Sequence, residues 1–377
     1  MIEYLEIRDT TATLVGVIDN AKSIIWVTEY YGAGSFEVYV ALTEQTKALL
    51  REGCYITRKN KVNAGIIEDI QYTNNPQDGL MIIASGRMLK SILDRRIVYQ
   101  LSGSTNSPTR LSGNVATAVL DVVDKHAGLQ AATARQMNVR KGSNGGITKT
   151  ITSDSGQDTM RQSSFGGLLE FTDRVLQEYG CGSLLRFNNV YNLFVYDCFE
   201  GKDRSAGNTA GNTPITFSMD FENLLSAEYI HSMTTWKNAA LVGGEGEGLQ
   251  RFFVFVPPSP PATGLNRREV FVDASSITQN YTDDSGQEQT YTNTEYARVL
   301  AAQGRSVLRD QTPTETFTGE INLAHSPYKF GQNADFWLGD LVTIQDNRLG
   351  LAIAVRVLKA TEVQDDGGYS LTIEYGN

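Results

Sequence analysis

The chain has 377 residues, a hydrophobic fraction of 41% and a net charge of −10, so it is long enough for two to four domains and too apolar for a disordered protein. The charge is uneven: residues 212–377 carry 11 Lys+Arg and 21 Asp+Glu, whereas residues 1–211 carry 22 of each. A tight grip on DNA needs clustered cations, so this composition argues against a dedicated nucleic-acid-binding protein.

The N-terminus and the thiols point to a protein made and folded in a cytoplasm. Residues 1–7 are acidic and alternating, unlike a secretory signal, and the longest apolar runs, such as residues 80–84, cover about five residues, far short of a membrane span. Cys54, Cys181 and Cys198 are odd in number and widely spaced. This pattern predicts reduced, buried thiols rather than a disulfide framework.

The first hundred residues predict antiparallel β-structure. Residues 36–42 place apolar side chains at every second position, which is typical of a half-buried strand. Residues 74–79 hold the Asn, Pro, Asp and Gly of a hairpin loop. Further strands are expected at residues 24–30, 54–58, 65–72 and 80–85. Short strands joined in this way predict a small barrel or sandwich.

Helices are expected next, within an α+β module at residues 113–200. A helical signal covers residues 86–96, and a second helix at 114–127 is expected to end at Gly128. A third at 165–179 has Ser164 as its expected cap and Gly180 as its stop. Strands at 183–188 and 193–198 complete the module, and polar residues 141–164 predict a long loop.

The second half returns to β-structure around one helix. The helix is expected from about Glu295 to Arg309, since Thr292 and Glu295 form a capping-box pattern. Residues 365–368 predict the turn of a terminal hairpin. The remaining predicted segments are strands at 215–219, 227–233, 239–242, 251–256, 267–273, 338–344, 349–361 and 369–375 and a stiff proline connector at 257–261.

Residue types that would carry catalysis or metal binding are present without the required spacing. His126, His231 and His325 lie about a hundred residues apart, with no zinc-ligand partner and no nucleophile motif. Residues 243–248 (GGEGEG) superficially resemble a phosphate loop, but their glutamates repel anions and an apolar strand follows. We therefore interpret this segment as a tight acidic turn.

Paired charges are interpreted as surface features. Asp283-Asp284 and Asp365-Asp366 lack the alternating oxygen ligands of a calcium loop, so they predict solvated turns. Arg95-Arg96 and Arg267-Arg268 are interpreted as surface charge or interface pairs. The sequence thus predicts no catalytic, cofactor-binding or metal-ligating residues and no cofactor.

Three pairs of segments, in order along nearly the whole chain, resemble the tail-tip hub proteins of tailed bacteriophages, a siphophage family structurally akin to the hub of contractile-tail baseplates. The segments are residues 64–70 with 84–96, 221–225 with 237–244, and 338–344 with 368–376. The resemblance implies an α+β, mostly β subunit in which two tube-like antiparallel β-barrel domains carry two inserted α+β or peripheral domains.

The resemblance and the predicted elements together give the expected domain boundaries. The predicted domains are an N-terminal β-barrel at 1–100, an α+β insertion at 101–212, the first part of a second β-barrel at 213–262, a peripheral insertion with helix 295–309 at 263–311, and the rest of the second barrel at 312–377.

The family implies a homotrimer whose six barrels continue a sixfold tail tube, closing the tail tip of the virion and gating genome passage. The expected partners are the tail-tube and distal tail proteins, the tape-measure protein, and tail fibres or receptor-binding proteins, with DNA passing without specific binding. Family members often carry a C-terminal lytic or adhesion module, whereas this sequence stops at Asn377 after its last predicted strand. We therefore expect a structural protein and not an enzyme.

Alternatives stay open at this stage. The acidic excess of residues 212–377 either lines a lumen, where it would repel DNA, or faces solvent and aids solubility. A receptor- or glycan-binding adhesin would display exposed aromatic residues, for which Tyr191 and Tyr281 are candidates. A tail-associated cell-wall hydrolase would need a cluster of carboxylates or a metal site, which spacing does not reveal.

Overall fold

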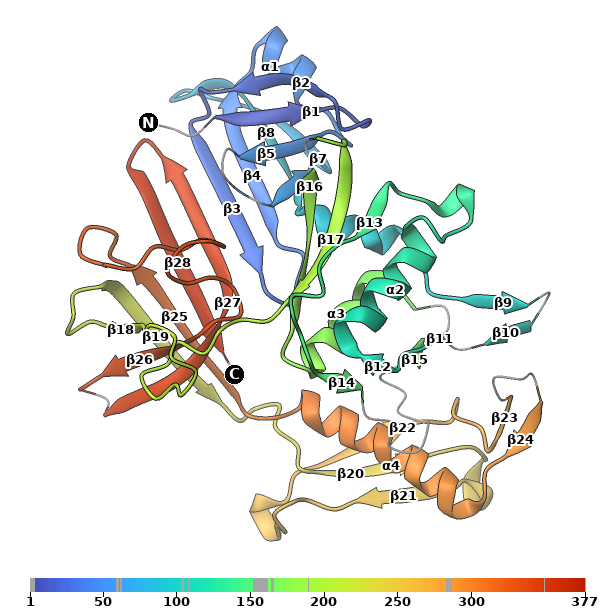
Figure 1. Cartoon of the computed structure of the whole chain (residues 1–377). Coiled ribbons are helices and arrows are strands. Elements are labelled where there is room, and N and C mark those ends of the chain that lie inside the picture. Colours follow the sequence, from blue (N-terminus) through green and yellow to red (C-terminus); the bar gives the residue numbers. More distant parts are fainter. Residues whose placement is uncertain are drawn as a thin grey trace.

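A computed structural model provides the structure of the chain. It describes residues 4–58, 61, 63–102, 105–107, 109–151, 162–163, 166–188, 190–282, 287–348 and 350–376. Strands account for 42% and helices for 19% of the chain, and most strand pairs are antiparallel, which confirms the α+β, mostly β class. Figure 1 shows the sheets and helices arranged around a central junction.

A ten-stranded sheet built from both ends of the chain is the centre of the fold. In Figure 1 its blue N-terminal strands stand beside its red C-terminal strands. Its path runs through β19 (Leu224–Ser232), β25 (Thr314–Ile321), β28 (Gly368–Gly376), β27 (Leu351–Asp365), β3 (Ser23–Glu29), β4 (Ser35–Ala41), β8 (Gly79–Arg87) and β7 (Asp69–Asn75). Off this path, β26 (Leu341–Asp346) pairs with β27, and β18 (Thr216–Ser218) pairs with β26.

The two predicted tube-like β-barrel domains are not closed barrels in the single chain. Within the described residues, no sheet closes on itself. Instead, β3 and β27 pair antiparallel, with Ser23 opposite Asp365 and Glu29 opposite Lys359. Each predicted barrel corresponds to one half of an open sheet, and the pairing of β27 with β3 joins the two halves.

The two halves of the sheet have the same connectivity. The N-terminal half uses β3, β4, β7 and β8 in sequence order, and the C-terminal half uses β19, β25, β27 and β28. In both, the spatial order is first, second, fourth, third strand. All neighbouring strands along the path are antiparallel. The halves consequently follow each other along the sheet as two copies of one repeat, pointing the same way.

One face of each half is covered by its own apolar core. In the N-terminal half, Trp26 and Val38 are buried beneath a second sheet and a short helix. These covering elements are β1 (Leu5–Arg8), β2 (Leu14–Ile18), β5 (Tyr55–Arg58), β6 (Ala64–Ile66) and α1 (Glu44–Leu49). In the C-terminal half, Phe217 packs against Phe336 and Tyr375, with ring centroids 5.3 and 6.0 Å from its own.

A middle module spans residues 88–200 and contains two of the predicted helices. α2 (Val115–Ala127) ends at Gly128, as predicted, and begins one residue later than predicted because Asn114 is its N-cap. The third predicted helix is shorter than expected, because α3 (Leu168–Glu178) begins after Gly167 rather than at Ser164, which lies outside the described residues. The 86–96 signal corresponds to a 3₁₀ helix, η1 (Leu89–Arg95), and the end of β8.

The strands of the middle module are short except for one hairpin. β16 (Gly182–Asn188) and β17 (Leu193–Phe199) pair antiparallel, and β13 (Val139–Lys141) adds a parallel strand. The predicted loop at 141–164 is described only at its two ends. The small elements are β9 (Gln100–Ser102), β10 (Thr105–Ser107), β11 (Thr109–Arg110), β12 (Gly113–Asn114), β14 (Thr150–Ile151), β15 (Gln162–Ser163) and η2 (Thr133–Arg135).

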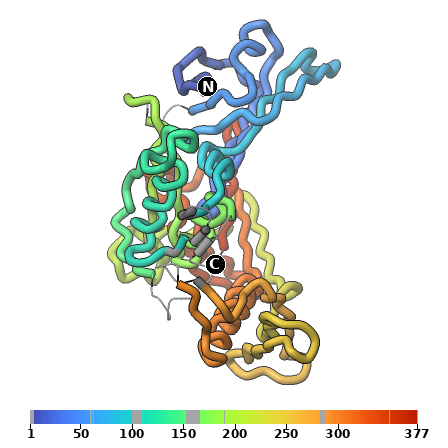
Figure 2. The backbone as a smooth tube through the Cα atoms, turned by 90° about the vertical axis from the view of Figure 1, so that its right-hand side faces the viewer, coloured from blue at the N-terminus to red at the C-terminus, as the bar shows by residue number. Residues whose placement is uncertain are grey.

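An inserted module, residues 233–313, interrupts the hairpin between β19 and β25, and Figure 2 shows it at the opposite end of the molecule from the N-terminal strands. α4 (Asn293–Asp310) has the predicted capping box of Thr292 and Glu295. It packs on a three-stranded sheet through Val299 and Leu300. The other elements are β20 (Ala239–Gly243), β21 (Phe253–Val256), β22 (Glu269–Asp273), β23 (Asn280–Thr282), β24 (Glu288–Thr290), η4 (Gly248–Gln250) and η5 (Gly264–Asn266).

A buried carboxylate ties the two ends of the chain together. The Glu362 side chain of β27 is 2% exposed and its Oε2 lies 3.4 Å from Nη1 of Arg58, which is 3% exposed. Lys61 Nζ lies 2.5 Å from Glu362 Oε1, and the Tyr369 hydroxyl donates to the same oxygen at 2.6 Å. The Arg58 guanidinium also lies over the ring of Trp26. These contacts join β5, β3, β27 and β28.

We predict that Glu362→Gln lowers the free energy of unfolding by about 3 kcal/mol, because it leaves the buried Arg58 charge without its carboxylate. Glu374→Gln is the matched control, since Glu374 is 40% exposed beside Lys359 and its loss should cost less than about 1 kcal/mol. Denaturant unfolding of both variants measures the difference. Equal effects of the two substitutions would contradict a role for the buried carboxylate.

Candidate functional site

The three histidines lie far apart in the structure and form no shared site. His126 is buried at the end of α2, where its Nδ1 is 3.4 Å from Arg135 Nη1. Burial, helped by the nearby Arg135 charge, lowers the pKa of His126 to about 4. His231 is exposed on β19, and His325 Nδ1 contacts the Asn322 side chain at 3.1 Å.

Cysteines and carboxylates provide no metal centre in the part of the chain that the structure describes, where no three His, Cys, Asp or Glu side chains gather. Cys54, Cys181 and Cys198 are buried free thiols. Burial raises the pKa of Cys181 to about 11 and also raises that of Cys198. Thiols held protonated in this way are poor nucleophiles and poor ligands.

The other singled-out segments have structural roles where they are described. The glycine-rich segment 243–248 is the connection between β20 and β21. In the hairpin turn at 365–368, Asp365 Oδ1 accepts from Gly367 N at 2.8 Å. Arg96 donates to the Arg135 carbonyl oxygen at 2.8 Å. Arg267 pairs with Glu269, and Arg268 lies over Trp236. Asp283 and Asp284 lie outside the described residues.

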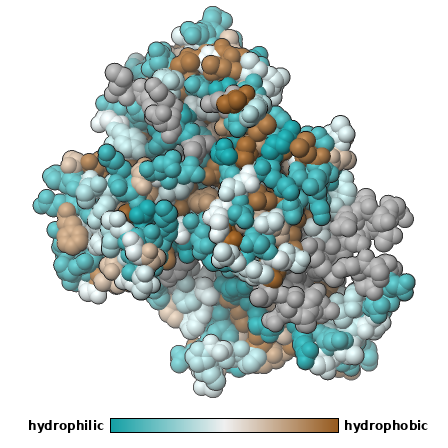
Figure 3. Space-filling view, viewed as in Figure 1, coloured by the Kyte–Doolittle hydropathy of each residue, from teal (hydrophilic) through white to brown (hydrophobic). Residues whose placement is uncertain are grey.

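The candidate adhesin aromatics do not form a platform. Tyr191 is 73% exposed in the β16–β17 turn, whereas Tyr281 stacks on Tyr291 with ring centroids 4.0 Å apart. On the face in Figure 3, hydrophobic residues form small separated areas among hydrophilic ones. None of the helices in the described ranges is long and apolar enough to cross a membrane.

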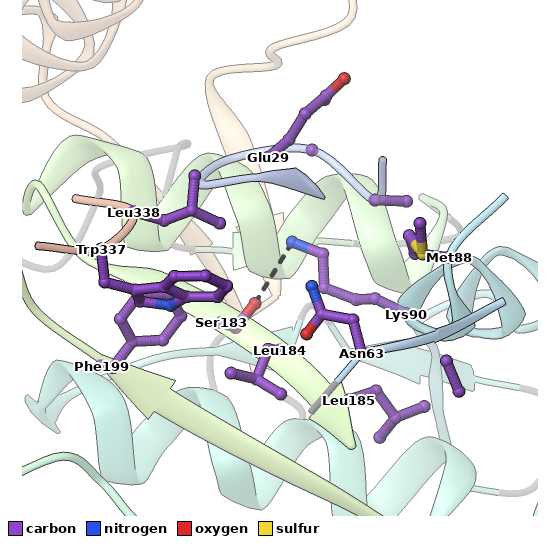
Figure 4. Close-up of a pocket in the computed structure, with 13 residues that line it drawn as sticks. Glu29, Asn63, Met88, Lys90, Ser183, Leu184, Leu185, Phe199, Trp337 and Leu338 are labelled. Atoms are coloured by element: carbon purple, nitrogen blue, oxygen red, sulfur yellow. Dashed lines mark hydrogen bonds between the residues drawn. The ribbon is translucent and has the colours of Figure 1, made fainter. Parts of the chain in front are cut away.

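A small cavity lies where the N-terminal half, the middle module and the C-terminal half meet (Figure 4). Lys90 projects into it, and Ser183, Asn63 and Trp337 line it from three separate segments of the chain. Lys90 Nζ donates to Asp173 Oδ1 at 2.9 Å, and desolvation raises the pKa of Asp173. At about 20 Å³ the cavity has room for about one water molecule. It is a polar junction between modules rather than a substrate pocket.

The most distinctive surface is the open face of the large sheet, opposite the two apolar cores. Because side chains alternate along a strand, every second residue of β3, β4, β25, β27 and β28 faces away from the core. Small hydroxyl side chains dominate this face. They are Ser23, Ser35, Thr73, Ser85, Thr316, Thr318, Thr361, Ser370 and Thr372.

Carboxylates accompany the hydroxyls across both halves of this open face. The acidic residues are Glu29, Glu37, Asp69, Glu228, Glu320, Asp365 and Glu374. Lys359 and Arg87 are cations of the face and are paired with carboxylates, Lys359 with Glu374 and Arg87 with Glu68 and Asp94. Arg356, opposite Gly376, donates to the Gly339 carbonyl oxygen instead. Hydroxyls and carboxylates thus make the face largely polar and negative, with apolar side chains such as Ile25, Val27 and Ile83 between them.

Each end of the large sheet is an unpaired strand edge within the described structure. β7 pairs with β8 alone, and β19 pairs with β25 alone. Tyr72 on β7 and Ile230 on β19 are 53% and 48% exposed. Long, partly apolar edges with free backbone groups are templates for pairing with another chain. Sequence reasoning missed both edges, because an edge is defined by what the other strands do.

Comparison with known proteins finds one family model and several solved structures that match this chain. The model of the siphovirus ReqiPepy6 Gp37-like protein family matches residues 4–377. The 43 kDa tail protein of prophage MuSo2 from Shewanella oneidensis has a similar structure, with 15% identity, a TM-score of 0.58, and coverage of 99% of this chain and 98% of that chain. A tail protein from Neisseria meningitidis MC58 gives 12% identity, a TM-score of 0.56, and coverage of 100% and 97%.

These matches confirm the predicted resemblance to tail proteins of tailed phages, and the two structures show that the whole chain shares their fold. Among curated proteins, none matches the sequence significantly.

We predict that His126 contributes to acid destabilisation. Its imidazole has a pKa near 4 in the fold and about 6.5 when unfolded. The neutral ring therefore favours the folded state above pH 6.5, and this contribution is lost as the pH falls toward 4. His126→Gln should make the fall of the unfolding temperature over this range shallower, whereas exposed His231→Gln should not. Parallel slopes for all three proteins would contradict the prediction.

Proposed function

This chain belongs to the siphovirus ReqiPepy6 Gp37-like family and has the fold of phage tail proteins, and we propose that three copies form the hub ring that closes the tail tip. The observation that carries the proposal is the repeat within the large sheet. Two four-stranded halves with the same connectivity follow each other in one direction. A threefold ring of such chains presents six similar units, which matches a sixfold tube without breaking symmetry.

We call the pairing of β27 with β3 the internal seam, and we take it as the model for the pairing between chains. Where the halves meet, the strand β27 of one half pairs antiparallel with β3 of the other. By the repeat, β7 is the counterpart of β27, and β19 is the counterpart of β3. β7 of one copy and β19 of the next are the open edges at the two ends of the path, so the same pairing, made between copies, closes the ring and removes both of these edges.

The position of β7 in this seam follows from the matching hairpins. β8 and β28 each have nine residues and begin at Gly79 and Gly368. Gln71 pairs with the fifth residue of β8, and Thr361 pairs with the fifth residue of β28. Gln71 is therefore the counterpart of Thr361, which lies at the internal seam.

The position of β19 follows in the same way from the strands beside it. In the N-terminal half, Val27 pairs with Ser35, and Ser35 pairs with Arg87. In the C-terminal half, Ile230 pairs with Thr316, and Thr316 pairs with Gly376. Arg87 and Gly376 are the last residues of equivalent strands, so Val27 and Ile230 are counterparts. Since Thr361 pairs with Val27 inside the chain, Gln71 is expected to face Ile230 of the next copy.

The open acidic face supports the assignment of the bore. In a closed ring one face of the sheet points inward, and the other carries the cores and modules. The face opposite the cores is the one with small hydroxyls and carboxylates such as Glu37 and Glu320. Negative walls repel the phosphate backbone, so DNA slides past without adhering. The acidic lumen proposed here thus draws on both halves of the chain.

In this proposal the chain acts in the virion tail as a non-enzymatic structural part. Ring contacts are made with the tail-tube and distal tail proteins, and fibres or receptor-binding proteins attach outside. As the terminal ring, the hub controls passage of the genome and the tape-measure protein. The four buried clusters support a division into two tube halves, a middle module and an inserted module.

We predict that the Gln71→Cys, Ile230→Cys double variant forms a covalent trimer under mild oxidation. Facing residues of paired strands have Cα atoms about 5.5 Å apart, within reach of a disulfide. A non-reducing gel should show a ladder that ends at three chains, while each single variant stays monomeric. The native cysteines are buried and should not interfere.

The control for this experiment shifts the register. Gln71→Cys with Ser226→Cys moves one partner four residues along β19, about 13 Å away, so no cross-link is expected. Cross-linking of this pair instead would overturn the register, and native mass measurement that finds monomers only, at all concentrations and with tail-tube protein added, would overturn the ring.

We predict that the assembled wild-type ring does not retain duplex DNA and that the Glu37→Lys, Glu320→Lys variant does, because cations replace carboxylates on the proposed bore. Fluorescence anisotropy with a labelled duplex at low salt measures retention, which added salt should abolish. Glu247→Lys, Glu288→Lys is the control, with the same charge change on exposed residues of the inserted module. Equal retention by both variants would contradict the lumen assignment.

A further inference from the structure

A groove of about 1200 Å³ runs along α4 in the inserted module, between that helix, a proline-rich strand exit and the end of α3. The lining residues that bear on its chemistry are Arg298, Arg305 and Arg309 on α4, Trp236 and Met233 before β20, and Glu178 on α3. It is far larger than the central cavity and lies in a module that the repeat of the sheet does not require.

The α4 wall is a stripe of arginines separated by a small residue. Arg298, Ala302, Arg305 and Arg309 follow spacings of four, three and four residues, which place them on one face of a helix. Arg298 and Arg305 are exposed. Alanine between them leaves room for another chain to approach the helix axis. The stripe from Arg298 to Arg309 is about 16 Å long.

The lining across from α4 is rich in apolar residues, beside a few polar ones such as Asn238 and Ser259. Pro257, Pro260 and Pro261 line it after β21, and Met233 is 37% exposed beside them. Trp236 is half-buried, with the guanidinium of Arg268 5.0 Å from its ring centroid. A groove with one cationic wall and one apolar wall suits a segment that carries carboxylates on one side and apolar side chains on the other.

The charge in the groove contrasts with the rest of the chain. Arg298, Arg305, Arg309 and Lys237 contribute cations, and among the described lining residues Glu178 is the single carboxylate. Glu178 Oε1 is already held by Arg309 Nη1 at 2.9 Å. Arg298 also acts on Glu295, one turn earlier on α4 and outside the lining. A surplus of positive charge is therefore concentrated here in a chain of net charge −10.

We propose that this groove binds an extended acidic peptide segment of a partner protein. Arg298 and Arg305 take its carboxylates through forked hydrogen bonds, and Trp236, Met233 and the prolines contact its apolar side chains. An extended strand covers the stripe with about five residues. The proposal does not rest on the ring, because every residue involved belongs to the inserted module or to α3.

An acidic peptide fits better than DNA or a small molecule. Four cations along one groove, flanked by Glu295 and Asp310 on the same helix, are few compared with the long basic tracks that duplex DNA requires. The groove is open along α4, whereas sites for small molecules enclose most of their ligand. A peptide uses both the arginines and the apolar wall.

The test uses the full chain and a fluorescein-labelled peptide of about eight residues, made of glutamate and leucine. Fluorescence anisotropy should show salt-sensitive binding to the wild type. Arg298→Glu, Arg305→Glu should raise the Kd by about tenfold or more. The substitutions are on exposed helix positions, and unchanged unfolding temperature and circular dichroism would show that the fold is intact. Trp236→Ala should weaken binding without changing its salt dependence.

The matched control is Arg51→Glu, Lys125→Glu, which makes the same charge change at exposed positions in the N-terminal half and the middle module. It should bind the peptide as the wild type does. Equal loss in both double variants, or no binding by the wild type, would overturn the proposal. Tighter binding of a single- or double-stranded oligonucleotide than of the peptide, lost with Arg298 and Arg305, would replace the peptide with nucleic acid as the occupant.

Discussion

Pairing between β3 and β27 joins strands more than 300 residues apart in the sequence, and everything else in the architecture is arranged around it. The free energy of such a seam comes from backbone hydrogen bonds and from burial of side chains on the core face. Glu362 is the exception on that face, since a carboxylate that is 2% exposed has a large desolvation cost unless it is fully paired. Arg58 and Tyr369 compensate it from neighbouring strands.

This arrangement makes the seam specific rather than merely strong. An apolar residue in place of Glu362 would pack well in several registers, whereas a buried charge is satisfied only where Arg58 reaches it. A one-residue slip of β27 would move the carboxylate to the open face and bury its neighbours Thr361 and Val363 instead. The ion pair thus fixes how the N-terminal and C-terminal halves meet, and with it the spacing of the two repeats.

The sequence predicted the local elements well. Capping residues such as Thr292 and stop residues such as Gly128 act within one or two turns, and the hairpin turns at 74–79 and 365–368 are fixed by their own residues. The sequence did not predict that the strands of the two halves form one open sheet. Alternation along residues 36–42 shows that a strand has one buried face, but it does not identify the strand beside it. Two barrels and one open sheet have the same local pattern.

The candidate surfaces also differ in how far the sequence could predict them. Metal and triad chemistry requires particular residues at particular spacings, so the sequence supports a prediction about such sites. The open acidic face could not be predicted from the sequence, since the pairing of β27 with β3 brings Glu37 and Glu320 onto one surface. The arginine stripe of α4 was readable as a helical spacing, yet its meaning depends on Trp236 and the prolines folding opposite it.

Insertion of residues 233–313 into a hairpin explains how the chain carries additional surfaces without disturbing the sheet. In the N-terminal half the corresponding first hairpin, β3 to β4, is closed by a short turn, so the repeat does not need anything there. In the C-terminal half the same position holds a module with its own core around Tyr296 and Leu300. A module that buries its own apolar residues adds little strain to the strands that it interrupts. The two halves are therefore free to keep one geometry, set by the seam, while the residues that distinguish them, including the α4 groove, lie outside the sheet.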